Sequence, residues 1–147
     1  MLLMIRALFN LLVRSDALRQ TVLPTSADTV AAAAIALTAN AGAWTWGLWA
    51  EIVSAANNGA DRQITGFTLE LPVFGIASAQ GEVQISTGAG GAEADPPSIG
   101  TFPVVAASYT LPKPIRVPAG TRLAARLRTS SAAADTLAIK LLTLTGF

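Results

Sequence analysis

The sequence predicts an all-β fold: one antiparallel β-sandwich, jelly-roll-like, with an apolar N-terminal helix or arm. Several short segments alternate apolar and polar residues, which is the pattern of half-buried strands. Clusters of turn-forming residues separate these segments at intervals of about 8 to 15 residues, the spacing of a sandwich or barrel. The 147 residues suffice for one domain with its own core. We therefore expect an arm over residues 1–19 and a single sandwich domain over residues 20–147.

The first nineteen residues carry apolar side chains at the i, i+3, i+4, i+7 spacing of an amphipathic helix. The same segment is equally compatible with an extended arm. Terminal segments are ordered only where contacts hold them, so two roles stay open: a helix that covers the chain's own core, and an arm that lies on a neighbouring subunit. The residues expected to make these contacts are Leu2, Ile5, Arg6, Phe9, Leu12 and Val13.

A run of twenty-two residues without a charge extends from Thr29 to Ala50, long enough for a transmembrane helix. Asn40 and Gly42 interrupt this run, and its flanks, Asp28 and Glu51, are acidic where a basic residue is expected on one side. We therefore expect no membrane span but two buried strands joined by a turn at residues 40–42. The alanine-rich first half is also compatible with a helix, although its β-branched residues favour a strand.

Three tryptophans stand within six residues of the next predicted strand, Ala43–Ala55. Trp44 and Trp46 are two residues apart and share a face, and Gly47 predicts a bulge that would re-aim Trp49. Large aromatic side chains fill cores and subunit interfaces, and they also stack on sugar rings. We favour the core or interface role, because no cluster of Asp, Asn or His accompanies the tryptophans to hydrogen-bond sugar hydroxyls.

The middle of the chain alternates turns and strands. Residues 57–61 form a turn with an Asn-Gly signal, and a strand follows over residues 64–71, closed by Pro72. Residues 82–87 predict another strand, and residues 88–97 are the longest segment of loop composition. The remaining β segments expected are 21–23 and 101–111, and residues 73–79 are apolar but broken by Gly75.

Residues 112–128 predict a short strand, a Pro-Ala-Gly turn and a longer strand, paired as an antiparallel hairpin. Alternation places Leu123 and Leu127 on the inner face of the longer strand. Its outer face carries arginines, which predicts either a solvated sheet face or ion pairing with an acidic partner surface. These arginines are Arg122, Arg126 and Arg128, with Arg116 near by. The last strand is expected over residues 135–145.

Composition excludes several chemistries. The chain has no cysteine and no histidine, so it lacks the residues of disulfides, of ordinary zinc sites and of histidine general bases. The net charge of +1 provides no strong field for nucleic acid. Only 13% of residues are charged, against about 25% in an ordinary soluble domain, which indicates either a chain embedded in lipid or a surface covered by other subunits. We expect no enzyme, no catalytic residues, no cofactor and no metal site; a hydrolase with paired glutamates is the weakest alternative.

Two motifs carry a resemblance to a known group. The strand 82–87 ends in Thr87-Gly-x-x-Gly-x-Glu93, and the later turn has the pattern Pro118-x-Gly-Thr-Arg122. Together they resemble small jelly-roll virion proteins of tailed bacteriophages, over roughly residues 43–145. The resemblance implies a capsid decoration, or cement, protein: a homotrimer that binds the major capsid protein on the exterior of the phage head after assembly in the host cytoplasm. It implies no nucleic-acid, membrane or small-molecule partner.

A second structural role stays open. A tail, baseplate or head-fibre protein would share the jelly roll, and its tryptophans would bind host glycans.

Overall fold

The computed structural model describes residues 19–23 and 34–146 of the chain. Of the predicted N-terminal arm, only Arg19 belongs to this described part, and it begins the first strand. The helix-or-arm prediction and its contact residues therefore lie outside the described residues. The contact residues predicted for this arm are Leu2, Ile5, Arg6, Phe9, Leu12 and Val13.

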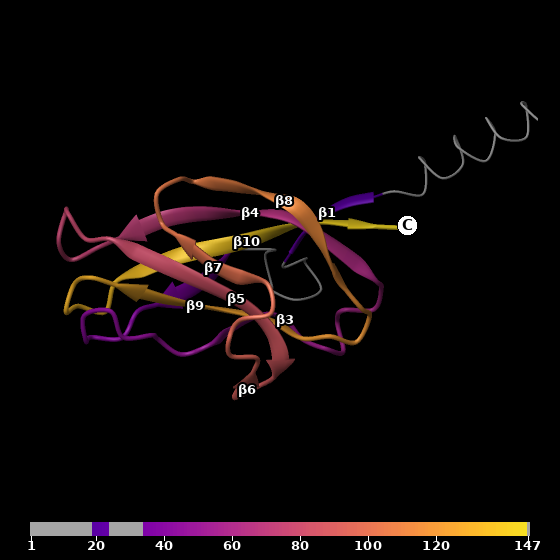
Figure 1. The fold of residues 1–147 in the computed structure, drawn as a ribbon, viewed down its shortest axis with the longest axis horizontal. Helices are drawn as coiled ribbons and strands as arrows, with labels where there is room; N and C mark the ends of the chain where they lie inside the picture. The colour runs from indigo at the N-terminus through magenta and orange to yellow at the C-terminus, as the bar shows by residue number, and fades with distance from the viewer. Residues whose placement is uncertain (1–18, 24–33, 147) are drawn as a thin grey trace, which may run out of the picture.

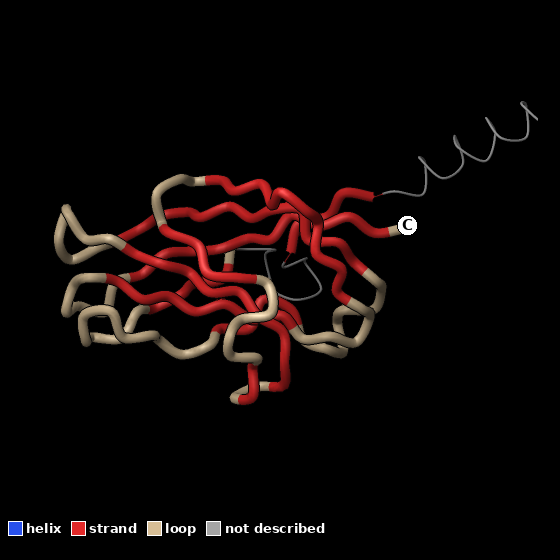
Figure 2. Tube along the Cα trace, viewed as in Figure 1, coloured by secondary structure: helices blue, strands red, loops and turns tan. Residues whose placement is uncertain are grey.

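The described residues form ten strands arranged as two antiparallel sheets that pack face to face (Figures 1 and 2). In the first sheet, β10 pairs with β4 on one side and with β1 and β2 in succession on the other, and β8 pairs with β4. In the second sheet, β9 lies between β3 and β5, and β6 and β7 pair with β5. The strands are β1 (Arg19–Leu23), β2 (Ile35–Thr38), β3 (Ala50–Val53), β4 (Arg62–Val73), β5 (Gly81–Ala89), β6 (Ala92–Glu93), β7 (Gly100–Pro103), β8 (Ser108–Val117), β9 (Leu123–Thr129) and β10 (Thr136–Thr145).

The strand order is that of a jelly roll. The principal strands run β2-β10-β4-β8 in one sheet and β3-β9-β5-β7 in the other. Apart from the step from β5 to β7, the chain changes sheet at each successive principal strand, as the two Greek keys of a jelly roll require. The predicted all-β sandwich is confirmed.

The core lies between the inner faces of the two sheets. Alternation along β10 buries Leu137, Ile139 and Leu141, and alternation along β5 buries Val83 and Ile85. An aromatic cluster continues this core toward β7 and β8. It consists of Phe67, Phe102 and Tyr109, with ring centroids 4.6 to 6.2 Å apart.

The predicted hairpin over residues 112–128 is wrong in its pairing. Its two strands exist as β8 and β9, but β8 pairs with β4 in the first sheet and β9 with β3 and β5 in the second. The turn at Pro118 therefore crosses from one sheet to the other. A buried side chain holds this crossing: the Nδ2 atom of Asn58 donates to the carbonyl oxygens of Pro118 (3.1 Å) and Thr121 (2.9 Å), and its Oδ1 accepts from Arg62.

Three predicted boundaries also differ. The strand expected over Ala43–Ala55 is regular only over β3. Pro72 does not end β4, which continues one residue further, and Val73 pairs with Thr136 at an irregularity in the ladder. The loop at 88–97 contains the short β6, which folds back on the end of β5. The turn at residues 40–42 is confirmed, because the Gly42 amide donates to the Asn40 side chain at 3.0 Å.

The two lateral sides of the sandwich differ. On the side of β2, which we call the closed side, residues 44–50 run so close to Thr38 that a Cβ on Gly47 would overlap its carbonyl oxygen. On the opposite side, which we call the open side, a groove of about 630 Å³ lies between the edge strands β7 and β8.

Candidate functional site: a tryptophan–arginine face and two grooves

The three tryptophans and two arginines of β9 form one row on the outer face of the second sheet, which we call the tryptophan–arginine face. The guanidinium of Arg128 lies 5.5 Å from the ring centre of Trp44 and 4.4 Å from that of Trp46. The guanidinium of Arg126 lies 5.0 Å from Trp46 and 4.3 Å from Trp49. Each arginine thus contacts two tryptophans, and Trp46 contacts both arginines. Contacts of this kind contribute about 0.5 to 1 kcal/mol each at exposed sites and more when desolvated.

Residues 44–50 run beside β9 and contain two more residues than the stretch of β9 that they face, which places the tryptophans next to the arginines. The amide of Trp44 donates to the Thr129 carbonyl at 2.6 Å, that of Gly47 donates to Leu127 at 2.8 Å, and Ala50 pairs with Ala125. Every three residues of the segment 44–50 therefore lie opposite two residues of β9. This is the geometry of successive bulges, one of which the sequence predicts at Gly47. It lets Trp46 and Trp49, which are three residues apart, lie on the same face of the sheet as the arginines.

Two carboxylates of the same chain form ion pairs with these arginines, and one amide oxygen accepts a hydrogen bond from Arg126. Arg128 donates twice to Oε2 of Glu82, at 2.8 and 2.5 Å. Arg126 donates to Oε1 of Gln84 at 2.7 Å and forms a 3.4 Å ion pair with Asp95. The arginine face is thus internally paired, whereas its predicted contact with an acidic partner surface stays a prediction.

The stacked arginines limit what the tryptophans can bind. Trp46 lies between two guanidinium groups, and Trp49 is half-buried beside Arg126. Trp44 stands at the end of the row, is 42% exposed, and holds a left-handed backbone conformation (φ 55°) that is strained for a bulky residue. Of the three, Trp44 has the most ring surface available for a ligand.

Arg122 joins the two sequence motifs. Its Nη1 atom pairs with Glu93, whose side chain is only 1% exposed, and its Nε atom donates to Glu51 at 2.6 Å. Burial raises the pKa of Glu93, but the hydrogen bond and charge of Arg122 outweigh burial, so the pKa lies below its usual value. The same carboxylates raise the pKa of Arg122 despite its own burial. The glutamate that ends the first motif thus meets the arginine that ends the second.

The remaining described charges lie apart from this face. Arg116, the fourth predicted arginine, forms a 2.5 Å ion pair with Asp61, and Lys140 pairs with Glu70 at 3.0 Å. The glutamates that a hydrolase would have to pair each form an ion pair with a basic side chain; they are Glu51, Glu70, Glu82 and Glu93. Among the basic side chains that the structure describes, only Lys113 has neither a hydrogen bond nor an ion pair.

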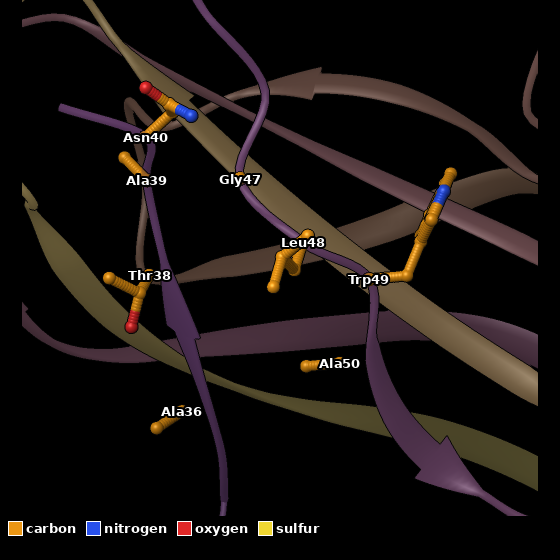
Figure 3. Close-up of a pocket in the computed structure, with 8 residues that line it drawn as sticks. All are labelled: Ala36, Thr38, Ala39, Asn40, Gly47, Leu48, Trp49 and Ala50. Atoms are coloured by element: carbon orange, nitrogen blue, oxygen red, sulfur yellow. The ribbon is translucent and has the colours of Figure 1, made fainter. Parts of the chain in front are cut away.

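A groove of about 380 Å³ lies on the closed side, between β2 and residues 47–50 (Figure 3). Leu48 and Ala50 project from their segment toward β2, whereas Trp49 projects the other way (Figure 3). Leu48 is 91% exposed, so this groove is shallow and open. Its polar groups are Thr38 and Asn40.

The larger groove lies on the open side. Ile99 and Phe102 line it from the second sheet, and Leu111 and Ile115 line it from β8 in the first. Lys113 and Arg116 supply its charges, and none of the described residues that line it carries a carboxylate. Sequence patterns did not indicate this groove, because it depends on how two edge strands from different sheets approach each other.

Comparisons of the chain with protein-family models, with curated proteins and with solved structures each found no match. No helix able to span a membrane occurs within residues 19–23 and 34–146. No group of three or more metal-ligating side chains is found over the same residues. Glu93 and Asp95, which the sequence places close together, engage different arginines.

Proposed function

We propose that this chain is a structural protein of a tailed-bacteriophage virion, a decoration protein that binds the major capsid protein on the head exterior and stabilises the shell as a homotrimer. One observation carries the proposal. The two motifs on which the resemblance rests meet in a buried ion pair, Glu93 with Arg122. Motifs that meet in this way act as one structural unit, and this supports a shared fold more strongly than two separate matches would.

The distribution of charge and apolar surface supports a binding role. Most described charges pair within the chain, so few free charges would have to be desolvated when another subunit covers the surface. Several large apolar side chains remain exposed: Leu48, Val73, Ile76 and Val105. A trimer that buries such groups on the intact lattice, but not on the ruptured one, would stabilise the shell by mass action.

Heads that lack the protein test this function. Purified protein is mixed with them, and sedimentation measures the bound fraction and its saturation. We expect saturable binding and a higher temperature of head rupture. Absence of binding to heads, together with recovery of the protein on tails, would overturn the decoration role.

Trp44 favours one alternative, a tail, baseplate or head-fibre protein that binds host glycans. Its exposed ring lies beside Arg128, and the Oε1 atom of Glu82 accepts none of the hydrogen bonds from that arginine. A glycan array tests this role: binding that Trp44→Ala abolishes and Trp49→Ala preserves would support it.

A further inference from the structure

The groove on the open side of the sandwich has no role in the fold described so far. Apolar side chains from both sheets line it, among them Phe102 and Leu111, and its volume of about 630 Å³ is that of a ligand site. The groove differs from an ordinary gap between edge strands in its origin, its charge and its exposed backbone.

The groove originates in an unusually large irregularity of β8. Ile64 pairs with Ile115 and Gly66 pairs with Thr110, so an advance of two residues along β4 matches five along β8. The extra residues include the Pro-Lys-Pro sequence at 112–114, which bulges out of the sheet. Prolines protect edge strands from aggregation, but protection alone requires no groove.

A side-chain bridge ties β8 to the end of β7 near the groove. The hydroxyl of Tyr109 donates to the carbonyl oxygen of Pro103 and accepts from the Val105 amide at 3.0 Å. Its ring stacks on Phe67 at 4.6 Å. The two edge strands are therefore tied together at Tyr109 and separate toward Arg116.

The charge of the groove is positive and partly uncompensated. Lys113 is exposed, stands on the bulge and has no partner within the described residues. Arg116 lies beside it with its charge balanced by Asp61. An apolar groove with one free ammonium group fits an apolar ligand that carries a carboxylate.

The backbone of β7 favours a peptide as this ligand. The β7 strand pairs only with β5, and the Val104 amide just beyond it donates to Gly81 of that strand. By alternation the peptide groups of Thr101 face away from β5, on the same side as the Pro103 carbonyl that Tyr109 contacts. An extended segment would find backbone partners there, as in β-strand addition, whereas a lipid would leave them unused.

We propose that this groove holds an extended segment of the major capsid protein, with apolar side chains between β7 and β8 and a carboxylate on Lys113. This inference rests on the proposed function and names the surface that performs it. The segment runs along β7 and stops at the Tyr109 bridge.

Charge substitutions test the contact with Lys113 on heads that lack the protein. We expect Lys113→Glu to weaken binding about tenfold or more and Lys113→Gln to weaken it less, because the first repels a carboxylate and the second only removes the attraction. Lys140→Gln is the matched control, since it removes a lysine that is paired with Glu70 on another strand, and should bind as the unchanged protein does.

Covalent labelling tests the groove itself. The chain has no cysteine, so Lys113→Cys introduces a single thiol that a benzophenone maleimide modifies. Irradiation on heads should cross-link it to a capsid-protein segment rich in apolar and acidic residues, identified by mass spectrometry. The same label on Ser78→Cys, an exposed position in another loop, should not cross-link to that segment.

The outcomes separate the two proposals. If the unchanged protein binds heads, but Lys113→Glu binds equally well and the label reaches no capsid segment, the groove inference is wrong and the decoration role stands. If the unchanged protein does not bind heads, both are wrong. Circular dichroism and thermal melting of each variant identify any loss of binding that is caused by unfolding.

Discussion

The two lateral sides of the sandwich are completed in opposite ways. On the closed side, residues 44–50 approach β2 so closely that only a glycine fits at position 47. On the open side, β8 bulges in its pairing with β4 at a segment that contains two prolines, and an apolar groove lies between β8 and β7. One jelly roll thus closes one pair of edges by backbone contact and leaves a groove between the other pair.

Gly47→Ala should break the closed side and produce the largest effect. The added Cβ would overlap the Thr38 carbonyl oxygen, which belongs to the backbone and has little freedom to move. Because overpacking costs about 1 to 3 kcal/mol and occasionally more, we expect a loss of about 3 kcal/mol in the free energy of unfolding. Urea denaturation measures this loss. Gly59→Ala is the control, since nothing lies within 4 Å of its added Cβ, and equal stability losses in the two variants would refute the close-contact account.

Trp46→Ala and Trp44→Ala test how the closed-side segment is held against β9. Trp46 contacts both arginines and is half-buried, whereas Trp44 contacts one and is 42% exposed. We expect Trp46→Ala to lower the free energy of unfolding by about 2 kcal/mol, with the lost packing and cation–π contacts as causes, and Trp44→Ala by about half as much. Thermal melting compares the two. The reverse order would show that the strained residue, not the stacked one, stabilises the segment.

Tyr109→Phe addresses the bridge that ties the open side together. The variant keeps the ring that stacks on Phe67 but loses the hydroxyl between Pro103 and Val105. We expect a loss of about 1 kcal/mol in the free energy of unfolding, as for one hydrogen-bonding group, and faster amide exchange at Val105. Unchanged exchange there would mean that the edges are held by the aromatic rings alone.

Acid should produce the smallest effect, and on the closed side it acts at Asp135. Asp135 is buried there, and its carbonyl oxygen accepts from the Ala39 amide at 2.8 Å. Burial raises the pKa of Asp135, but hydrogen bonds from Ser131, Thr129 and the Gly75 amide outweigh it, so the pKa lies below its usual value. Its stabilising contribution is therefore complete above the pKa of the unfolded chain and is lost as pH falls through the lowered folded pKa.

Asp135→Asn isolates this contribution. At neutral pH we expect the variant to be less stable by about 0.5 to 1 kcal/mol, because the amide keeps one acceptor oxygen but weakens the hydrogen bonds that the carboxylate accepts. The difference from the unchanged protein should shrink as pH falls through the lowered pKa. A constant difference across the acid range, measured by denaturation at several pH values, would contradict the assignment.

The sequence predicts the strands better than it predicts their partners. Alternation identifies β5, β9 and β10 because it depends on neighbours in the chain, and the bulge at Gly47 follows from a glycine within a strand pattern. The pairing of β8 with β4 does not follow, because a Pro-Ala-Gly turn serves equally in a hairpin and in a crossing between sheets. The crossing is held by the Asn58 side chain, which donates hydrogen bonds to Pro118 and Thr121, about sixty residues away in the chain.

The candidate site shows the same limit. The arginine row on β9 follows from alternation, but its partners Glu82 and Gln84 become visible only once β5 is placed beside β9. The groove next to Lys113 depends on two edges in different sheets. Its one signal in the sequence is the Pro-Lys-Pro run, which predicts an edge strand but no cavity.

Because every three residues of the segment 44–50 lie opposite two residues of β9, the length of this segment decides which face of the sheet its side chains occupy. Deleting one residue between Trp46 and Trp49 would remove a bulge and turn the side chains that follow to the opposite face of the sheet. Trp49 would then enter the apolar interior, and Ile52, which is buried in the unchanged protein, would face solvent. Among evolutionary variants of this chain, insertions and deletions should therefore be rare in this segment.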